Sequence, residues 1–243
     1  MQPQVILITG ASSGFGKITA QMLSEQGHIV YGTSRKPSGN MNNVKMLVAD
    51  VTNILSIHEA VGQIISEQGR IDVLINNAGM GIGGALELAT EDEISGQMNT
   101  NFFGVVNMCK VVLPYMRKAR RGKIINISSI GGVMGIPYQG FYSASKFAVE
   151  GYSEALALEV HPFHIKVCVV EPGDFSIMLG ASSEDIRLSD ILTVKEYGAI
   201  ETGQTKTANP VSASTNGEMK NNVLDNNLST VWELSLIHIS EPT

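Results

Sequence analysis

Short apolar runs that alternate with helical patterns constrain the fold of this chain more than any other feature. The first run, Val5-Ile6-Leu7-Ile8, is continuous, as in a strand buried on both faces. Similar runs, with helical stretches between most of them, stand at 28–33, 45–49, 72–75, 123–127 and 166–170. Because strands that alternate with helices are joined by crossovers, the pattern predicts an α/β fold with a right-handed, doubly wound parallel sheet.

A glycine-rich turn follows the first run. It reads Thr9-Gly10-Ala11-Ser12-Ser13-Gly14-Phe15-Gly16 and leads into a helical pattern through Leu23. A strand, a glycine-rich turn and a helix in this order aim backbone N–H groups and a helix N-terminus at a phosphate. Glycine is needed because a Cβ would block the approach of the backbone to the ligand. The spacing is GxxxGxG rather than GxGxxG, and tight turns also use glycine, so the turn alone leaves both interpretations open.

The end of the second expected strand bears on the choice of dinucleotide. An acidic side chain there would bind the ribose 2′-hydroxyl of NAD. Here the strand ends in Ser34-Arg35-Lys36, a small neutral residue and two cations, which suits the charge-assisted binding of a 2′-phosphate. The alternative is a solvated basic loop. The pattern favours NADP(H) over NAD(H) as the cofactor.

A tyrosine and a lysine stand four residues apart in Tyr142-Ser143-Ala144-Ser145-Lys146, where a helical pattern over 142–159 begins. Residues at this spacing share a helix face, so the ammonium would lie beside the phenol. A phenol ionises near pH ~10, and acid–base work near neutrality requires a change of ~4 kcal/mol. One cation about 4 Å away supplies roughly that much at an effective dielectric of ~20. Taken alone, the pair also fits an amphipathic helix with a surface tyrosine and lysine.

Composition and charge exclude several classes of protein. The 243 residues are 43% hydrophobic, enough for one domain with a full core. A net charge of -6 offers no surface for nucleic acid, and no apolar run approaches the ~20 residues that span a bilayer. Met1 leads almost directly into the first strand, without a secretory signal, and Cys109 and Cys168 lie in apolar surroundings. We expect a cytoplasmic protein with buried free thiols that binds no metal, membrane or nucleic acid.

Several further motifs agree in order and spacing. Ser129 follows Asn101 by twenty-eight residues and precedes Tyr142 by thirteen. The other motifs are the TGxxxGxG turn, Asp50, the NNAG run at 76–79, Lys146 and Pro172-Gly173. With this set, residues 1–176 resemble a short-chain dehydrogenase/reductase of the single-domain type. The resemblance implies a Rossmann-like fold and an oxidoreductase that interconverts a carbonyl and its alcohol by hydride transfer, with NADP(H) as the cofactor.

The resemblance also implies roles for residues at matching positions. Tyr142 would protonate the carbonyl oxygen, or act as the base in alcohol oxidation. Lys146 would make the phenol more acidic and hydrogen-bond the nicotinamide ribose, Ser129 would hold the substrate oxygen, and Asn101 would keep a water in the proton relay. The positions that match cofactor contacts are Gly10, Ser12, Ser13, Gly14, Phe15, Gly16, Ser34, Arg35, Asp50, Val51, Asn77, Ala78, Gly79, Tyr142, Lys146, Pro172 and Gly173.

For both asparagines a structural role stays open, because either could tie strands together through backbone contacts. For Asn77 the structural role is as well supported as a contact with the cofactor. The walls of the substrate cleft are expected from 80–84 and 131–139, which are mostly apolar. We therefore expect a small hydrophobic ketone, aldehyde or alcohol as substrate, and a homo-oligomer when the chain is full length.

After Ser176 the resemblance stops. Residues 204–233 resemble the opening of a discoidin-type (F5/8 C) sugar-binding β-sandwich, and 234–243 resemble translated sequencing-adapter DNA. We interpret 1–176 as a C-terminally truncated NADP-binding oxidoreductase domain and 177–243 as a chimeric or artefactual tail. Because 177–230 is rich in Asn, Ser, Thr and Gly, we expect it to be irregular and the chain as written to be weakly active or inactive. Two alternatives remain, a carbohydrate-binding protein that uses the tail and a non-catalytic nucleotide sensor.

Overall fold

The computed structural model describes residues 2–37, 39, 41 and 43–170, together with the backbone of 174–182, 185–193 and 237–240. The chain divides into two compact units near residue 171. Pro172, Gly173 and the discoidin-like stretch at 204–233 lie outside the described residues.

The first unit contains a six-stranded parallel sheet in the order β3-β2-β1-β4-β5-β6. Its strands are β1 (Val5–Ile8), β2 (Ile29–Ser34), β3 (Val44–Val48), β4 (Val73–Asn76), β5 (Gly122–Ile127) and β6 (Ile165–Val170). Every strand predicted from an apolar run is present, with boundaries that differ by no more than one residue. The strand order reverses between β1 and β4, and in such sheets ligands bind beyond the carboxyl ends of the strands at this point. The doubly wound fold is confirmed.

Helices connect the strands. The α-helices are α1 (Gly14–Glu25), α2 (Ile54–Gln68), α3 (Glu91–Met98), α4 (Gly104–Ala119) and α5 (Gly140–Val160). Short 3₁₀ turns are η1 (Leu86–Leu88), η3 (Ile130–Gly132) and η4 (His161–Phe163), and a π-helical turn, η2 (Asn99–Phe103), joins α3 to α4. A π turn therefore separates α3 from α4, a feature common at functional sites. No described helix has the length and apolar character needed to cross a membrane.

Local signals explain where these helices begin. The Asn53 side chain caps α2 by accepting from the N–H groups of Leu55 and Ser56. Thr90 and Glu93 form a reciprocal capping box at the start of α3. Such caps satisfy N–H groups that have no partner inside the helix, each stabilising by ~1 kcal/mol.

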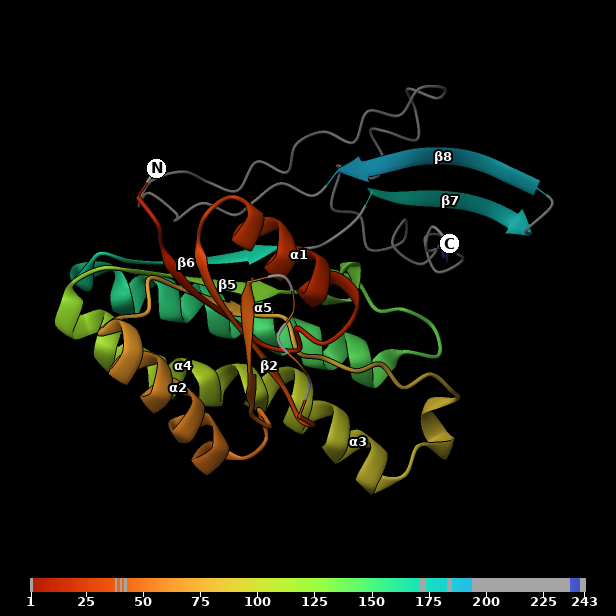
Figure 1. Cartoon of the computed structure of the whole chain (residues 1–243). Coiled ribbons are helices and arrows are strands. Elements are labelled where there is room, and N and C mark those ends of the chain that lie inside the picture. Colours follow the sequence, from red (N-terminus) through yellow and green to blue (C-terminus); the bar gives the residue numbers. More distant parts are fainter. Residues whose placement is uncertain are drawn as a thin grey trace. The chain divides into compact units, whose positions relative to one another are not determined.

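The sheet is covered on both faces, as a parallel sheet requires. The larger core packs α2, α4 and α5 against side chains such as Leu7, Leu74 and Ile124. The smaller core, with Ile6 and Ile8, packs Ala20 of α1 against the opposite face, and Figure 1 shows α1 on one side of the sheet with α2 and α4 on the other. Neighbouring residues of β1 belong to different cores because side chains alternate along a strand.

The second unit contains a three-stranded antiparallel sheet in the order β8-β7-β9, formed by β7 (Asp174–Ser182), β8 (Asp185–Thr193) and β9 (Ile237–Ser240). The irregular backbone expected over 177–230 is therefore wrong for 177–182 and 185–193. Antiparallel pairing satisfies main-chain N–H and C=O groups largely regardless of which side chains they carry, so composition was a poor guide there. Residues 194–230 lie outside the described residues.

Candidate active site

The glycine-rich turn between β1 and α1 is shaped by close backbone contacts. Gly10 has a φ of +66°, and a Cβ there would lie 2.9 Å from the Cα of Ala78. Gly16 is buried, and a Cβ on it would lie 2.6 Å from the carbonyl oxygen of Gly10 and against the Asn77 amide. The turn therefore tolerates no side chain at either position, and the role of Gly16 is to let α1 pack closely on the loops after β1 and β4.

The loops that follow β1 and β4 are tied together by hydrogen bonds. The Thr9 hydroxyl oxygen accepts from the backbone N–H groups of Asn77 and Ala78, both at 3.0 Å. The Asn77 side-chain amide donates to the carbonyl oxygens of Thr9 at 3.0 Å and Gly10 at 3.2 Å. Asn77 thus has the structural role left open by the sequence while it also faces the cavity beside the turn. Thr9, which the sequence analysis did not single out, holds both loops.

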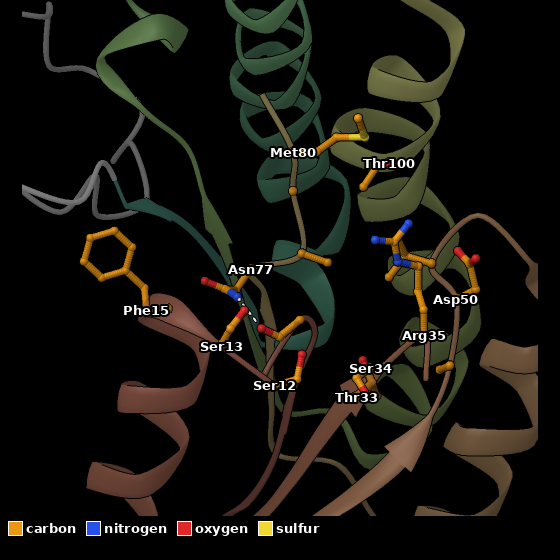
Figure 2. A pocket seen from close by; sticks show the side chains of 16 residues that line it. Ser12, Ser13, Phe15, Thr33, Ser34, Arg35, Asp50, Asn77, Met80 and Thr100 are labelled. Carbon is orange, nitrogen blue, oxygen red and sulfur yellow. Dashed lines mark hydrogen bonds between the residues drawn. The ribbon is translucent and has the colours of Figure 1, made fainter. Parts of the chain in front are cut away.

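A cavity of about 300 Å³ opens at the carboxyl ends of β1, β2, β3 and β4. This is within the usual size range of ligand and cofactor sites. Twelve residues expected to contact a cofactor line it: Gly10, Ser12, Ser13, Gly14, Phe15, Ser34, Arg35, Asp50, Val51, Asn77, Ala78 and Gly79. Figure 2 shows Ser12, Ser13 and Phe15 on one side of the cavity and Arg35 and Asp50 on the other.

Three residues that line the cavity were missed from the sequence: Thr33, Ala49 and Thr100. A fourth, Met80, was expected in the wall of the substrate cleft and lines this cavity instead. Thr33 and Ala49 stand at the carboxyl ends of β2 and β3, so the rule that ligands bind at this edge could have found them. Thr100 comes from the π turn, for which the sequence offers no signal. Of the expected cofactor residues, Gly16, Tyr142 and Lys146 do not line this cavity.

The Asp50 carboxylate is engaged in a turn at the rim of the cavity. It accepts from the backbone N–H of Thr52 at 2.9 Å and from the Thr52 hydroxyl at 2.7 Å, while the Asp50 N–H donates to Ser56. These bonds fix the entry into α2. The carboxylate still faces the cavity, so a contact with a ligand is compatible with its structural role.

Asn101 lies in the π turn η2 and is fully buried. Its carboxamide forms a two-way clamp on the backbone of Met80, accepting from the N–H at 2.8 Å and donating to the carbonyl at 2.8 Å. A further bond of 3.0 Å goes to the Ser145 hydroxyl. The side chain therefore supports the structural alternative, because it joins the loop after β4 to α5.

Tyr142 and Lys146 lie one turn apart near the start of α5, which begins at Gly140 rather than at the tyrosine. The Lys146 ammonium lies 5.7 Å from the centre of the Tyr142 ring and donates to the carbonyl oxygen of Ile127 at 2.8 Å. Lys146 is only 6% exposed. Burial lowers the pKa of Lys146 to about 8, and Glu150 acts in the opposite direction. The lysine is thus mostly charged at neutral pH but close to losing its proton.

Glycines bring the other expected catalytic groups close to this pair. Gly79 lines the cavity, and a Cβ on it would lie 3.9 Å from the Lys146 nitrogen. The Ser129 hydroxyl accepts from the N–H of Gly131, and a Cβ on Gly131 would lie 3.2 Å from the Tyr142 ring. A phenol, an ammonium and a hydroxyl therefore gather at the same sheet edge as the cavity. Such a set can deliver a proton to a carbonyl oxygen and stabilise the phenolate that remains.

The fold is that of a known protein family. The sequence pattern of the short chain dehydrogenase family matches residues 4–185, three quarters of the chain. The protein belongs to this family.

Among particular relatives, the chain is 88% identical over 176 residues to the 3-ketodihydrosphingosine reductase of Bacteroides thetaiotaomicron, a match that covers 72% of this chain and 65% of the relative. A short-chain dehydrogenase structure from Streptomyces avermitilis is 38% identical and superposes with a TM-score of 0.67, covering 71% of this chain and 66% of that one. The structure of ElxO with NADP bound is 33% identical, with a TM-score of 0.67 and coverage of 71% and 74%. The chain thus spans just under two thirds of the Bacteroides relative.

Proposed function

We propose that this chain carries the cofactor site and the catalytic residues of an NADP(H)-dependent reductase that acts on the keto group of a long-chain, apolar substrate. The arrangement of Tyr142, Lys146 and Ser129 beside the cavity carries the proposal. The name of the 88% identical relative, a 3-ketodihydrosphingosine reductase, supports a ketone that bears a long alkyl chain. Cys109 and Cys168 are buried and form no disulfide, which suits the reducing cytoplasmic compartment expected from the sequence.

The residues around the cavity fit a dinucleotide with a 2′-phosphate. The turn from Gly10 to Gly14 leaves room for a pyrophosphate against backbone N–H groups and the start of α1. Arg35 lines the opposite side, and β2 ends in Ser34 rather than in an acid. The NADP bound to the related ElxO structure supports the same choice. When bound, the cofactor supplies the hydride.

The protein's own residues would supply the proton and the position of the ketone. Tyr142 donates its phenolic proton to the carbonyl oxygen as the carbonyl is reduced. The buried Lys146 ammonium stabilises the phenolate, and this interaction is strong because little water screens it. Ser129 donates a hydrogen bond to the same carbonyl oxygen and orients it toward Tyr142.

A second cavity, of about 220 Å³, supports an apolar chain on the substrate. It is lined by Ile82, Gly83, Gly84, Ala85, Leu86, Leu88, Ala89, Glu93, Tyr138, Gly140 and Phe141. Phe141 directly precedes Tyr142. A Cβ on Gly81, the residue before Ile82, would lie 3.8 Å from the Tyr142 ring, so this apolar groove starts beside the proposed proton donor. Tyr138 has a φ of 62° and is 71% exposed, and its carbonyl accepts from the N–H of Gly84 at 2.8 Å. A tyrosine in this conformation costs about 1–3 kcal/mol, and such strain clusters at ligand sites.

The homo-oligomer expected from the sequence is also proposed. Large apolar side chains are exposed on α5 and at the start of α4: Phe103, Phe147 and Leu158. Exposed apolar side chains that gather on neighbouring helices often mark an interface. Light scattering on the full-length protein would show the oligomer, and a monomer at micromolar concentration would contradict it.

The Tyr142→Phe variant tests the proposed function. It removes the phenolic oxygen and leaves the ring in place, so the fold should persist while turnover of NADPH with a long-chain ketone falls by at least a hundredfold. The measurement uses a version of the chain with a C-terminal segment like that of the family. Tyr115→Phe, an exposed tyrosine on α4, is the matched control and should keep its rate. A Tyr142→Phe variant with most of its turnover intact would overturn the proposal.

A further inference from the structure

We infer that Glu150 is a positioning residue of the proposed active site, whose half-buried carboxylate keeps Lys146 charged and thereby sets the pH range in which Tyr142 works. This inference rests on the proposed function and deepens it. Glu150 carries no signal in the sequence, because a glutamate on a long helix ordinarily belongs to a solvated face. Its place in the structure is different.

Helix α5 carries the three titratable groups on one face. Tyr142, Lys146 and Glu150 stand at successive intervals of four residues, so each lies about one turn from the next. The Lys146 ammonium lies over the ring of Tyr142, which is one helix turn toward the N-terminus. Glu150 is the corresponding neighbour on the other turn, and the lysine lies between a phenol and a carboxylate.

The Glu150 carboxylate points into the protein. Its Oε1 atom has almost no contact with solvent. The position that a Cβ on Gly132 would occupy lies 2.9 Å from this Oε1 and 2.5 Å from the Ser128 hydroxyl oxygen. The carboxylate therefore packs against the η3 turn, directly after Ser129, in space that only a glycine at 132 leaves open.

Glu150 also differs from the other charged groups near α5 in its effect on the pKa of Lys146. The carbonyl oxygen that accepts from Lys146 belongs to Ile127 and carries no net charge. Glu150 raises the pKa of Lys146 against the larger effect of burial. Other charged groups on the described elements packed against α5, or further along it, are Glu91, Asp92, Glu93, Glu154, Glu159, His161 and Lys166. None of these contributes to the shift of the Lys146 pKa.

The size of the effect follows from Coulomb's law. Two unit charges about 10 Å apart at an effective dielectric of ~20 change a pKa by about one unit. Because the pKa of Lys146 is about 8, loss of the Glu150 charge would lower it toward neutrality and leave a larger share of the lysines uncharged at neutral pH. A neutral amine no longer stabilises a phenolate. Glu150 would thus act on the reaction through Lys146, without touching the substrate.

The titration of Lys146 tests this directly on the 243-residue chain. The protein is labelled with 13C at lysine Cε, and the Lys146 resonance is assigned by its loss in Lys146→Arg. In Glu150→Gln, which preserves shape and removes charge, the midpoint should fall by about one pH unit. Glu154→Gln removes an exposed carboxylate one turn further along α5 and should leave the midpoint where it is. An unchanged midpoint in Glu150→Gln would overturn the inference.

A second variant covers the case in which Glu150→Gln does not fold. Glu150→Asp keeps the charge but withdraws it by one methylene, so the midpoint should fall by less than one unit and by more than in Glu154→Gln. A midpoint that equals the parent value, or rises, contradicts the inference. The titration involves no turnover, so its failure is distinct from a failure of the Tyr142→Phe experiment.

Discussion

Replacement of Lys146 by methionine should change how the stability of the fold depends on pH. Burial lowers the pKa of Lys146 from its ordinary value of 10.5 to about 8. Between these values the unfolded chain binds a proton that the folded chain does not, so the parent's free energy of unfolding rises with pH across this window. A difference of about 2.5 pKa units corresponds to roughly 3 kcal/mol. Below pH 8 the folded protein bears this whole cost, and above pH 10.5 it bears none.

Lys146→Met removes the titrating group, so the stability difference between variant and parent isolates its contribution. The variant also leaves the carbonyl of Ile127 without its donor, which costs about 1–3 kcal/mol at every pH. Urea unfolding at pH 7 and pH 10.5 gives the free energy of unfolding of the parent and of the variant. From the lower to the higher pH, the parent should gain about 3 kcal/mol of stability relative to the variant. Lys110→Met, on the exposed face of α4, is the control and should show no such shift. A Lys146→Met difference that is the same at both pH values would refute the reasoning.

Four further substitutions probe the proposed cofactor site and the groove. In fluorescence titrations, Arg35→Ala should reduce the difference in binding free energy between NADPH and NADH by about 1–3 kcal/mol. Ser34→Asp should shift the cofactor preference toward NADH. Equal binding of the two cofactors by the parent protein would contradict the expected preference for NADPH. Gly16→Ala should lower the melting temperature and weaken NADPH binding, because the new Cβ would meet the Gly10 carbonyl. The control is Gly62→Ala on α2, where a Cβ has open space, and this variant should be neutral or more stable by up to ~1 kcal/mol. Leu86→Asp should raise KM for long-chain ketones by at least tenfold and leave KM for short-chain ketones unchanged. Equal effects on both classes of ketone would exclude the groove as the binding site of the alkyl chain.

The sheet could be predicted closely from the sequence because strands buried on both faces must be continuously apolar, as Val5–Ile8 is. The residues that line the cavity could be predicted because the carboxyl ends of parallel strands meet at one edge of the sheet, and because a turn with a positive φ, such as that at Gly10, requires glycine. Contacts between side chains and groups distant in the chain could not be predicted. The amide of Asn101 binds Met80, and the carboxylate of Glu150 packs beside Gly132, only because the tertiary fold brings these groups together. The π turn at Asn99–Phe103 likewise has no local signature, since its residues also suit an α-helix.

The most direct test of the proposed reductase is a stoichiometric assay with NADPH and a long-chain 3-keto sphingoid base. The protein should carry a C-terminal segment like that of the family, and the product should be identified by mass spectrometry. We predict that one NADPH is consumed for each ketone converted to its alcohol. NADPH that binds but is not consumed in the presence of such ketones would contradict it.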